Sequence, residues 1–204
     1  MKCMEKQNEW QNIYEFLKAI QSLKSVTRAT LATEERKENS AEHSWSVAMI
    51  VWLLSYKFQE EFDQIIDIEK LIKMALMHDL IEIQIGDTSV WDKENRSKIE
   101  QQEQNKDIFL FLIASLPLSL KEELIELKDE FEEAKTLESK IVKGVDRLSA
   151  ALQRVVTKQG WVNEGHNEKD LDNVQLPKID FSEVLKSLYN QIKQESFQED
   201  LLEK

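Results

Sequence analysis

His78 and Asp79 are adjacent in the chain and are flanked by apolar residues on both sides. Burying an ionised carboxylate among methionine and leucine side chains is costly unless a partner compensates its charge. A metal cation serves a carboxylate and an imidazole together, so metal binding is the first chemical hypothesis for this pair. The simpler alternative is a structural ion pair, which also occurs in protein cores.

Two further residues complete a candidate metal site. His43 lies near the start of one apolar segment, and Asp146 interrupts the apolar face of another. Alone, each would usually be a satisfied core histidine or a solvent-facing aspartate. With His78 and Asp79 they form a set of two imidazoles and two carboxylates, whose charge of about −2 neutralises a divalent ion. In an octahedral field about two coordination positions stay open, as a catalytic site requires.

The donor atoms narrow the choice of metal. Because no thiolate takes part and only two imidazoles do, we expect one divalent ion of Mn, Co, Fe, Ni or Mg in preference to a dedicated Zn centre. Such an ion lowers the pKa of a bound water from 15.7 to about 7 and polarises phosphoryl oxygens. His166, the third histidine, lies in a polar segment and is expected to be exposed and outside the site.

Helices must position these residues. Only four glycines and two prolines interrupt 204 residues, and apolar residues recur at spacings of three and four, which predicts an all-α protein. The four ligands then come from three helices. The predicted helical segments are 10–23, 44–58, 68–83, 93–116, 119–134, 136–158 and 180–204, with loops at 33–39 and 160–177.

Capping residues indicate where these helices begin and end. A glutamate three residues after Asn39, and another three residues after Ser119, have the spacing of a capping box. Asp67 and Asp180 are the expected N-caps of two further helices. Gly86 is expected to end the helix that carries His78.

Composition and charge exclude several classes of partner. With 27 basic and 39 acidic residues, the formal charge of −12 disfavours nucleic acid. The longest apolar run, 47–54, is far shorter than the ~18 residues of a membrane span. Cys3 is the single cysteine, which forbids an internal disulfide and fits a reducing compartment. We therefore expect one cytoplasmic domain over residues 1–204 that binds neither membranes nor nucleic acid.

The order His, His-Asp, Asp resembles that of the HD-domain metal-dependent phosphohydrolases. In the branch of 5′-deoxynucleotidases, an arginine precedes the first histidine, and the doublet is followed by a glutamate and then by Gly-Asp. The residues that match this pattern are Arg28, Glu82, Gly86 and Asp87. The resemblance covers about residues 13–155 and implies a single compact helical HD-domain fold with the metal site in the core of the helix bundle.

The resemblance also implies roles. Glu82 and Asp87 would be the catalytic acid and base, in an order that the sequence leaves open, and Arg28 would bind the substrate phosphate. The ordinary alternatives are a solvated helix end for the two acids and a surface charge for the arginine. Lys93 and Arg96 would add positive potential near the same site.

The expected function is a metal-dependent 5′-nucleotidase that releases phosphate from deoxynucleoside or ribonucleoside 5′-monophosphates. Two alternatives stay open: a phosphohydrolase for another small phosphate ester or phosphodiester, and a non-catalytic helical binding protein with a structural metal. Ala29 stands where the bacterial relatives have a tryptophan that helps to exclude the ribose 2′-hydroxyl, which leaves sugar selection open. The family also implies a homodimer, in which the apolar stripe of the last helix could pack against a second copy or against its own core.

Overall fold

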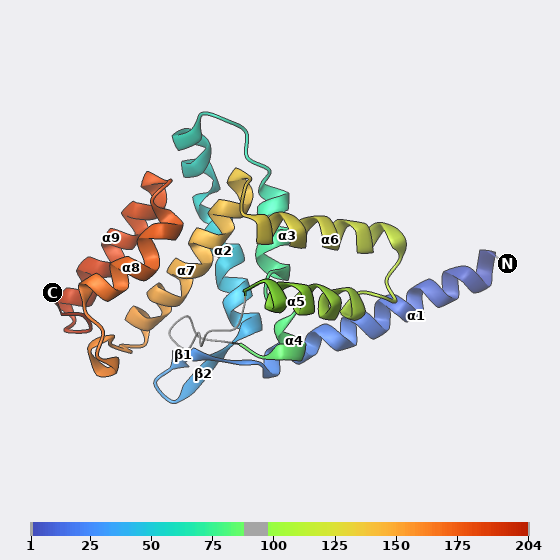
Figure 1. Ribbon diagram of the computed structural model, residues 1–204, viewed down its shortest axis with the longest axis horizontal. Helices are drawn as coiled ribbons and strands as arrows, with labels where there is room; N and C mark the ends of the chain where they lie inside the picture. Colours follow the sequence, from blue (N-terminus) through green and yellow to red (C-terminus); the bar gives the residue numbers. More distant parts are fainter. Residues whose placement is uncertain (1, 88–97, 204) are drawn as a thin grey trace.

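Helices account for most of the computed structural model, which describes residues 2–87 and 98–203 (Figure 1). The prediction of an all-α protein is confirmed, and residues 93–97 of one predicted helix lie outside the described residues. None of the described helices is both long and apolar enough to cross a membrane. The elements are α1 (Lys2–Ile20), the 3₁₀ helix η1 (Gln21–Ser25), β1 (Thr27–Thr33), β2 (Arg36–Asn39), α2 (Ser40–Phe62), α3 (Ile68–Met77), α4 (Glu82–Ile85), α5 (Lys98–Leu112), α6 (Leu118–Glu133), α7 (Leu137–Val156), η2 (Val162–Glu164), α8 (Glu168–Ile179) and α9 (Glu183–Gln198).

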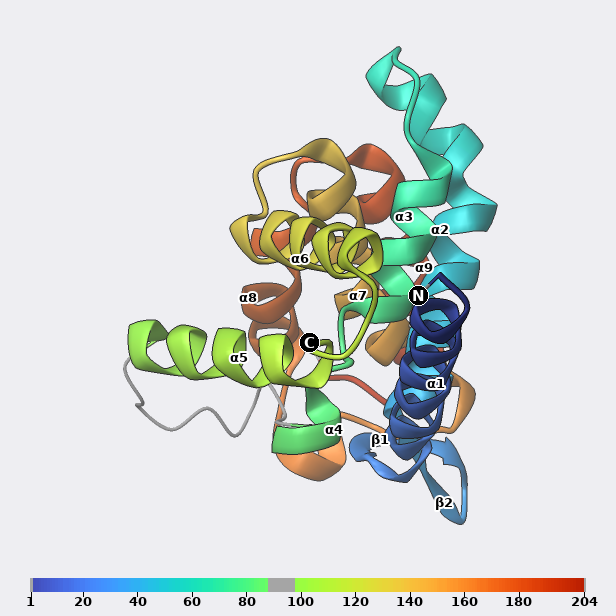
Figure 2. The same ribbon diagram turned by 90° about the vertical axis from the view of Figure 1, so that its right-hand side faces the viewer.

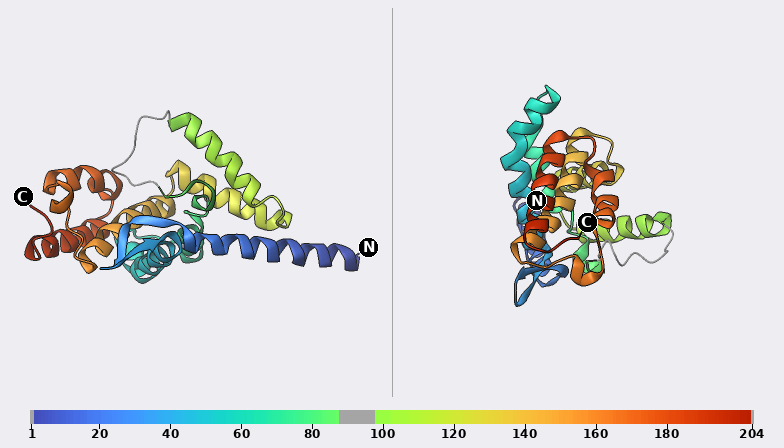
Figure 3. Two further views of the ribbon diagram at one scale, coloured as in Figure 1. Left: turned by 90° about the horizontal axis from the view of Figure 1, so that it is seen from below. Right: turned by 90° about the vertical axis from the view of Figure 1, so that its left-hand side faces the viewer.

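Three helices build the centre of the molecule. α2 packs against both α3 and α7, and α7 also contacts α6, α8 and α9. One face of α7 is fully buried, because its apolar residues repeat with the helical period. Its central members are Ile141, Val142, Val145 and Leu148. α1 extends away from this centre, on the same side of the molecule as α2, while α5 and α6 lie on the other side (Figures 2 and 3).

The prediction of a loop at 33–39 is wrong, since this segment forms the turn and second strand of a two-stranded hairpin. β1 and β2 are antiparallel, with Thr27 opposite Asn39 and Thr33 opposite Arg36. Three of the seven residues of β1 are threonines, which favour the extended backbone. The charged segment β2 pairs with β1 by backbone hydrogen bonds. The hairpin brings Arg28 on β1 beside Glu38 on β2.

Local capping signals predicted some helix starts and not others. Asn39 and Glu42 form the expected capping box, and the Asp67 carboxylate accepts the Lys70 amide at the start of α3. The predicted cap at Ser119 is wrong: α6 begins two residues earlier, with Pro117 as its N-cap. The fixed φ of a proline suits the entry to a helix, and it outweighs the capping-box spacing here.

The predicted helix 68–83 is interrupted. α3 ends at Met77 with His78 as its C-cap, a turn follows, and the short α4 then runs from Glu82 to Ile85. Gly86 ends α4 with a φ of +74°, a left-handed conformation that glycine adopts without a steric penalty. The break matters for function because it separates the His-Asp doublet from Glu82.

The carboxyl-terminal third differs from its prediction. Residues 160–177 are not a loop throughout, because α8 begins at Glu168 with a capping box of Asn167 and Asp170. The polar composition that suggested a loop is the cap and first turn of α8, and Pro177 lies inside the helix. Asp180 ends α8, and Ser182 caps α9, which finishes at Gln198 and not at residue 204.

Candidate metal and phosphate site

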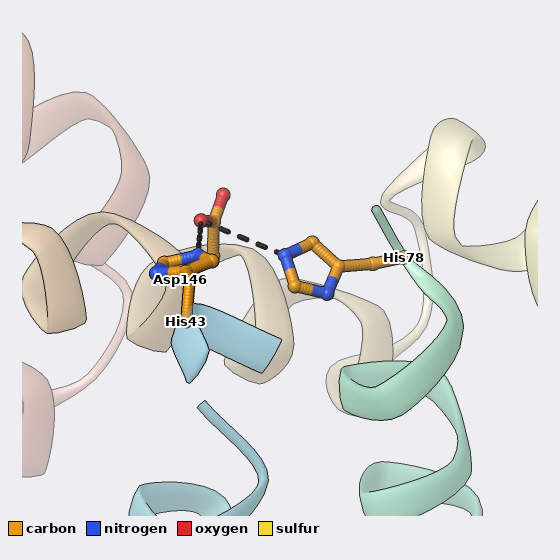
Figure 4. Close-up of side chains that lie close together, drawn as sticks. All are labelled: His43, His78 and Asp146. Carbon is orange, nitrogen blue, oxygen red and sulfur yellow. Dashed lines mark hydrogen bonds and ion pairs between the residues drawn. The ribbon is translucent and has the colours of Figure 1, made fainter. Parts of the chain in front are cut away.

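His43, His78 and Asp146 meet in the centre of the fold (Figure 4). Nε2 of His43 lies 2.9 Å from Oδ1 of Asp146, and Nε2 of His78 lies 3.8 Å from the same oxygen. One ligand atom of each residue lies within 4.8 Å of the other two, close enough for one metal ion to contact all three. Both histidines are buried, and Asp146 is partly exposed.

Each member of this cluster is placed by a local feature of its helix. The capping box sets the start of α2 one turn before His43. Nδ1 of His78 lies 2.7 Å from the carbonyl oxygen of Ala75, which is an acceptor only, so Nδ1 carries a proton and Nε2 is the ring nitrogen left to bind a metal. Nε2 of His78 is buried and has no hydrogen-bond partner. A buried, unpaired imidazole nitrogen aimed at a carboxylate is the donor arrangement that a divalent ion requires, so the residues fit a metal.

Asp79 lies at the edge of the cluster. Its Oδ1 is 3.2 Å from Nε2 of His78, and its Oδ2 is 3.9 Å from Nε2 of His43. The same Oδ2 accepts a hydrogen bond of 3.1 Å from Nη1 of Arg28. All four expected ligands are therefore close together, with Asp79 shared between the histidines and an arginine.

Arg28 is surrounded by carboxylates. Besides Asp79, its Nη1 lies 3.5 Å from Oδ1 of Asp87 and 3.9 Å from Oε1 of Glu82. Its Nε lies 3.5 Å from Oε2 of Glu38. Burial acts to lower the pKa of Arg28, but the neighbouring carboxylates outweigh it and raise this pKa, so the guanidinium stays charged. The three residues expected to bind and process the phosphate thus converge on one point.

The acidic surroundings also change the pKa values of the site. Burial, followed by the nearby charge of Asp79, raises the pKa of Glu82 to about 8, although Ser40 donates a hydrogen bond of 2.5 Å to its Oε2. Burial lowers the pKa of His78, but the carboxylates of Asp79 and Asp146 outweigh it and raise that pKa to about 9. Burial raises the pKa of Asp146, but the hydrogen bond with His43 and the nearby imidazole of His78 outweigh it and hold this pKa well below its usual value. Glu82 and His78 therefore bind protons more tightly than usual, which compensates negative charge that a bound cation would otherwise compensate.

Sequence reasoning missed two residues of this site. Glu38 is 2% exposed and lies between Arg28 and His43, and Ser40 contacts Glu82. The alternating pattern of a strand would have been the signal for Glu38, but the segment reads as a charged loop. Ser40 carried no signal, because its partner lies 42 positions away in the sequence.

The remaining basic and histidine candidates add nothing to the described cluster. Lys93 and Arg96 lie outside the described residues. His166 is half-buried after η2, where its amide donates to the carbonyl of Trp161, and the group of three that could hold a metal does not include it. Its predicted exposure is therefore only partly correct.

Comparisons with known proteins show the family of the chain and the similarity of its fold. A family model described as "HD domain" matches residues 20–196. The 5'-deoxynucleotidase HDDC2 of Dictyostelium discoideum is 32% identical over 145 residues, which cover 70% of this chain and 75% of the relative. The corresponding protein of Danio rerio is 29% identical over 144 residues, covering 70% and 68%. A crystal structure of a predicted metal-dependent phosphohydrolase from Magnetospirillum magnetotacticum MS-1 is similar with a TM-score of 0.81 and 27% identity, covering 98% of both chains.

Proposed function

Because the chain belongs to the HD domain family, we propose that it is a metal-dependent phosphohydrolase that releases phosphate from deoxynucleoside 5′-monophosphates. One observation carries this proposal: a buried arginine and two acids lie directly beside a cluster of two histidines and two aspartates. A purely structural metal would need the cluster alone. The names of the relatives, which are 5'-deoxynucleotidases, support the choice of substrate.

His43, His78, Asp79 and Asp146 would hold the ion. When bound, a divalent ion supplies Lewis acidity, which stabilises negative charge on phosphoryl oxygens and makes a coordinated water more acidic. Mn, Co, Fe, Ni and Mg remain the expected choices, with Zn less favoured, because the donor set has two imidazoles, two carboxylates and no thiolate.

The other residues of the site bind the phosphate and handle protons. Arg28 is the phosphate ligand, since a guanidinium offers a planar pair of donors to two phosphate oxygens. Glu82 and Asp87 both lie within 3.9 Å of Nη1 of that arginine and are the candidates for the acid and the base. The raised pKa of Glu82 suits a group that exchanges a proton near neutral pH. The division of these two roles stays open.

The test is phosphate release from a panel of deoxy- and ribonucleoside 5′-monophosphates, with each of the six metals added in turn. We expect release from the nucleotides, and loss of both metal and activity in Asp79→Ala. Metal binding without release from any nucleotide would favour a structural metal, and release only from other phosphate esters or diesters would favour a different phosphohydrolase. Full activity in Asp79→Ala would overturn the assignment of the site.

Sugar preference is part of the same panel. Ala29 is exposed on β1, next to Arg28, and it offers a methyl group where the bacterial relatives have a tryptophan. A smaller side chain leaves more room near the sugar, so we expect ribonucleotides to be hydrolysed as well, at rates within about tenfold of the deoxynucleotides.

We also place the protein in the cytoplasm as a homodimer. The stripe of α9 packs against the protein's own core, where Leu185 and Ile192 are buried and Phe181, Val184 and Leu188 are partly buried. α2 instead leaves Trp45, Trp52 and Tyr56 exposed on one face. Two copies of this face can pack against each other around a twofold axis, as an isologous interface requires.

The oligomeric state tests this assembly. We expect a dimer by analytical ultracentrifugation and a monomer for Trp52→Glu, because a charge in an apolar interface is costly. Ile65→Glu is the matched control, since Ile65 is 94% exposed and follows α2 in a loop. A monomeric wild-type protein, or a dimer that Trp52→Glu leaves intact, would contradict the proposed surface.

A further inference from the structure

Three buried polar atoms without hydrogen-bond partners lie close together beside the metal cluster and the arginine. They are Oε2 of Glu38, Nε of Arg28 and Nδ1 of His43. The Glu38 oxygen is 3.5 Å from the arginine nitrogen and 3.9 Å from the imidazole nitrogen. A buried carboxylate oxygen without a hydrogen bond costs free energy, so its retention beside two site residues calls for an explanation.

Glu38 lies between a predicted metal ligand, His43, and the predicted phosphate-binding residue, Arg28. His43 directs Nε2 toward Asp146, at 2.9 Å, and its other ring nitrogen therefore faces Glu38. Histidines that bind metals usually donate the second ring N–H to a carboxylate or a carbonyl group, which sets the tautomer and the ring orientation. Arg28 uses Nη1 toward the acids of the site and turns Nε toward Glu38.

We propose that Glu38 is a positioning residue for both halves of the site. In the metal-loaded protein its Oε2 accepts the Nδ1–H of His43, which leaves Nε2 as a bare ligand. The same oxygen holds Nε of Arg28, which leaves the Nη groups for the phosphate. Glu38 itself touches neither the ion nor the substrate. The inference rests on the proposed function only for the role of Arg28, since the orientation of His43 concerns metal binding alone.

This role makes a specific structural demand. The present 3.9 Å between His43 and Glu38 is an ion-pair distance, so the contact must shorten to a hydrogen bond in the metal-loaded protein. The competing explanation is a structural ion pair between Glu38 and Arg28 that leaves His43 unaffected. The two explanations differ in the state of the His43 ring, which nuclear magnetic resonance can report.

The experiment compares Glu38→Gln with Glu42→Gln. Both variants remove a carboxylate near the start of α2, but Glu42 pairs with Arg36 on the outer side. Zn²⁺ affinity is measured by chelator competition, and the His43 ring N–H is observed in the Zn²⁺-loaded protein by nitrogen-15 spectroscopy, for which the chain offers only three histidines. We expect Glu38→Gln to weaken Zn²⁺ binding by about tenfold or more and to shift the His43 N–H resonance. Glu42→Gln should change neither.

Several outcomes overturn the proposal. A proton on Nε2 of His43 in the Zn²⁺-loaded wild-type protein would overturn it. This measurement needs no variant, so it remains available if Glu38→Gln does not fold. Equal Zn²⁺ affinity and an unshifted resonance in a folded Glu38→Gln would do the same. Nucleotide hydrolysis is absent from these measurements: a Glu38-dependent metal site without phosphate release would refute only the proposed function.

Discussion

Individual residues of the site are constrained by uncompensated negative charge. One arginine, Arg28, faces four carboxylates: Glu38 lies near its Nε, and Asp79, Glu82 and Asp87 lie near its Nη1. Removing this arginine would leave buried like charges facing one another, which is costly. The informative change at this position therefore keeps the charge and removes the planar pair of donors.

Arg28→Lys should raise the KM for a nucleoside 5′-monophosphate by roughly tenfold, because an ammonium cannot make the paired hydrogen bonds of a guanidinium. Metal content should stay at the wild-type level. Steady-state kinetics and metal analysis check both statements, with Arg36→Lys, on the outer side of the hairpin, as the control. Loss of the metal in Arg28→Lys would mean that this arginine supports the ligands and not the phosphate.

Glu82 predicts a pH dependence of stability in the presence of a chelator. Its pKa is about 8 in the folded protein and about 4.3 in an unfolded chain, so the folded state binds the proton more tightly. The stability from this proton is complete below the unfolded pKa and is lost as pH rises toward 8, by at most about 1.4 kcal/mol per pH unit.

Denaturant unfolding from pH 5 to 9 should therefore show wild-type stability falling more steeply than that of Glu82→Gln. The comparison isolates Glu82, because His78 titrates in both proteins. Parallel pH profiles for the two proteins would show that Glu82 ionises normally.

At the scale of elements, the site is formed where a helix start, a helix end and a β-hairpin come together. The capping box at the start of α2 and the C-cap at the end of α3 place His43 and His78, and the hairpin β1–β2 places Arg28. The end of α3 before Asp79 lets the doublet turn toward α7, while α4 directs Glu82 back toward Ser40. His43, His78, Glu82 and Arg28 thus lie near the ends of their elements, whereas Asp146 lies in the middle of α7.

Asn39→Ala should lower the free energy of unfolding by about 0.5–2 kcal/mol, because the Glu42 amide loses its cap. Ser119→Ala should change it by less than about 0.5 kcal/mol, since Ser119 lies inside α6 and caps nothing. Urea denaturation of both variants measures the difference. Equal losses would mean that the helix starts are misplaced.

At the scale of the whole molecule, the carboxyl-terminal helices complete the core around α7. Gly144 lies on α7 where α8 and α9 approach, and a Cβ there would meet Cδ1 of Leu185 at 2.6 Å and the carbonyl oxygen of Lys178 at 3.3 Å. This close approach explains why α7 has a glycine two residues before Asp146. The metal site therefore depends on helices that contribute no ligand to it.

Gly144→Ala should destabilise the protein by about 1–3 kcal/mol through overpacking against Leu185. Leu185→Ala alone should cost about 2–5 kcal/mol by leaving a cavity. The double variant should be less destabilised than the sum of the two, because the smaller side chain makes room for the new methyl group. Thermal or urea denaturation measures this coupling, and strict additivity would contradict the contact.

The sequence by itself determined the helical class, the capped start of α2 and the residues that could hold a metal. These are local properties: helical periodicity, capping and the donor chemistry of side chains can be read over a few positions. The resemblance to the family then pointed to Arg28, Glu82 and Asp87, and the structure brings all three together.

Only the tertiary structure decided how these residues meet. The strand pairing at 27–39, the break after Met77 and the start of α8 depend on contacts with distant segments, which local patterns do not encode. Glu38 is the clearest case: a charged residue in a polar stretch becomes a buried neighbour of Arg28 and His43 because the hairpin folds over the start of α2. Burial and charge compensation are properties of the assembled fold, and a local sequence pattern therefore could not predict them.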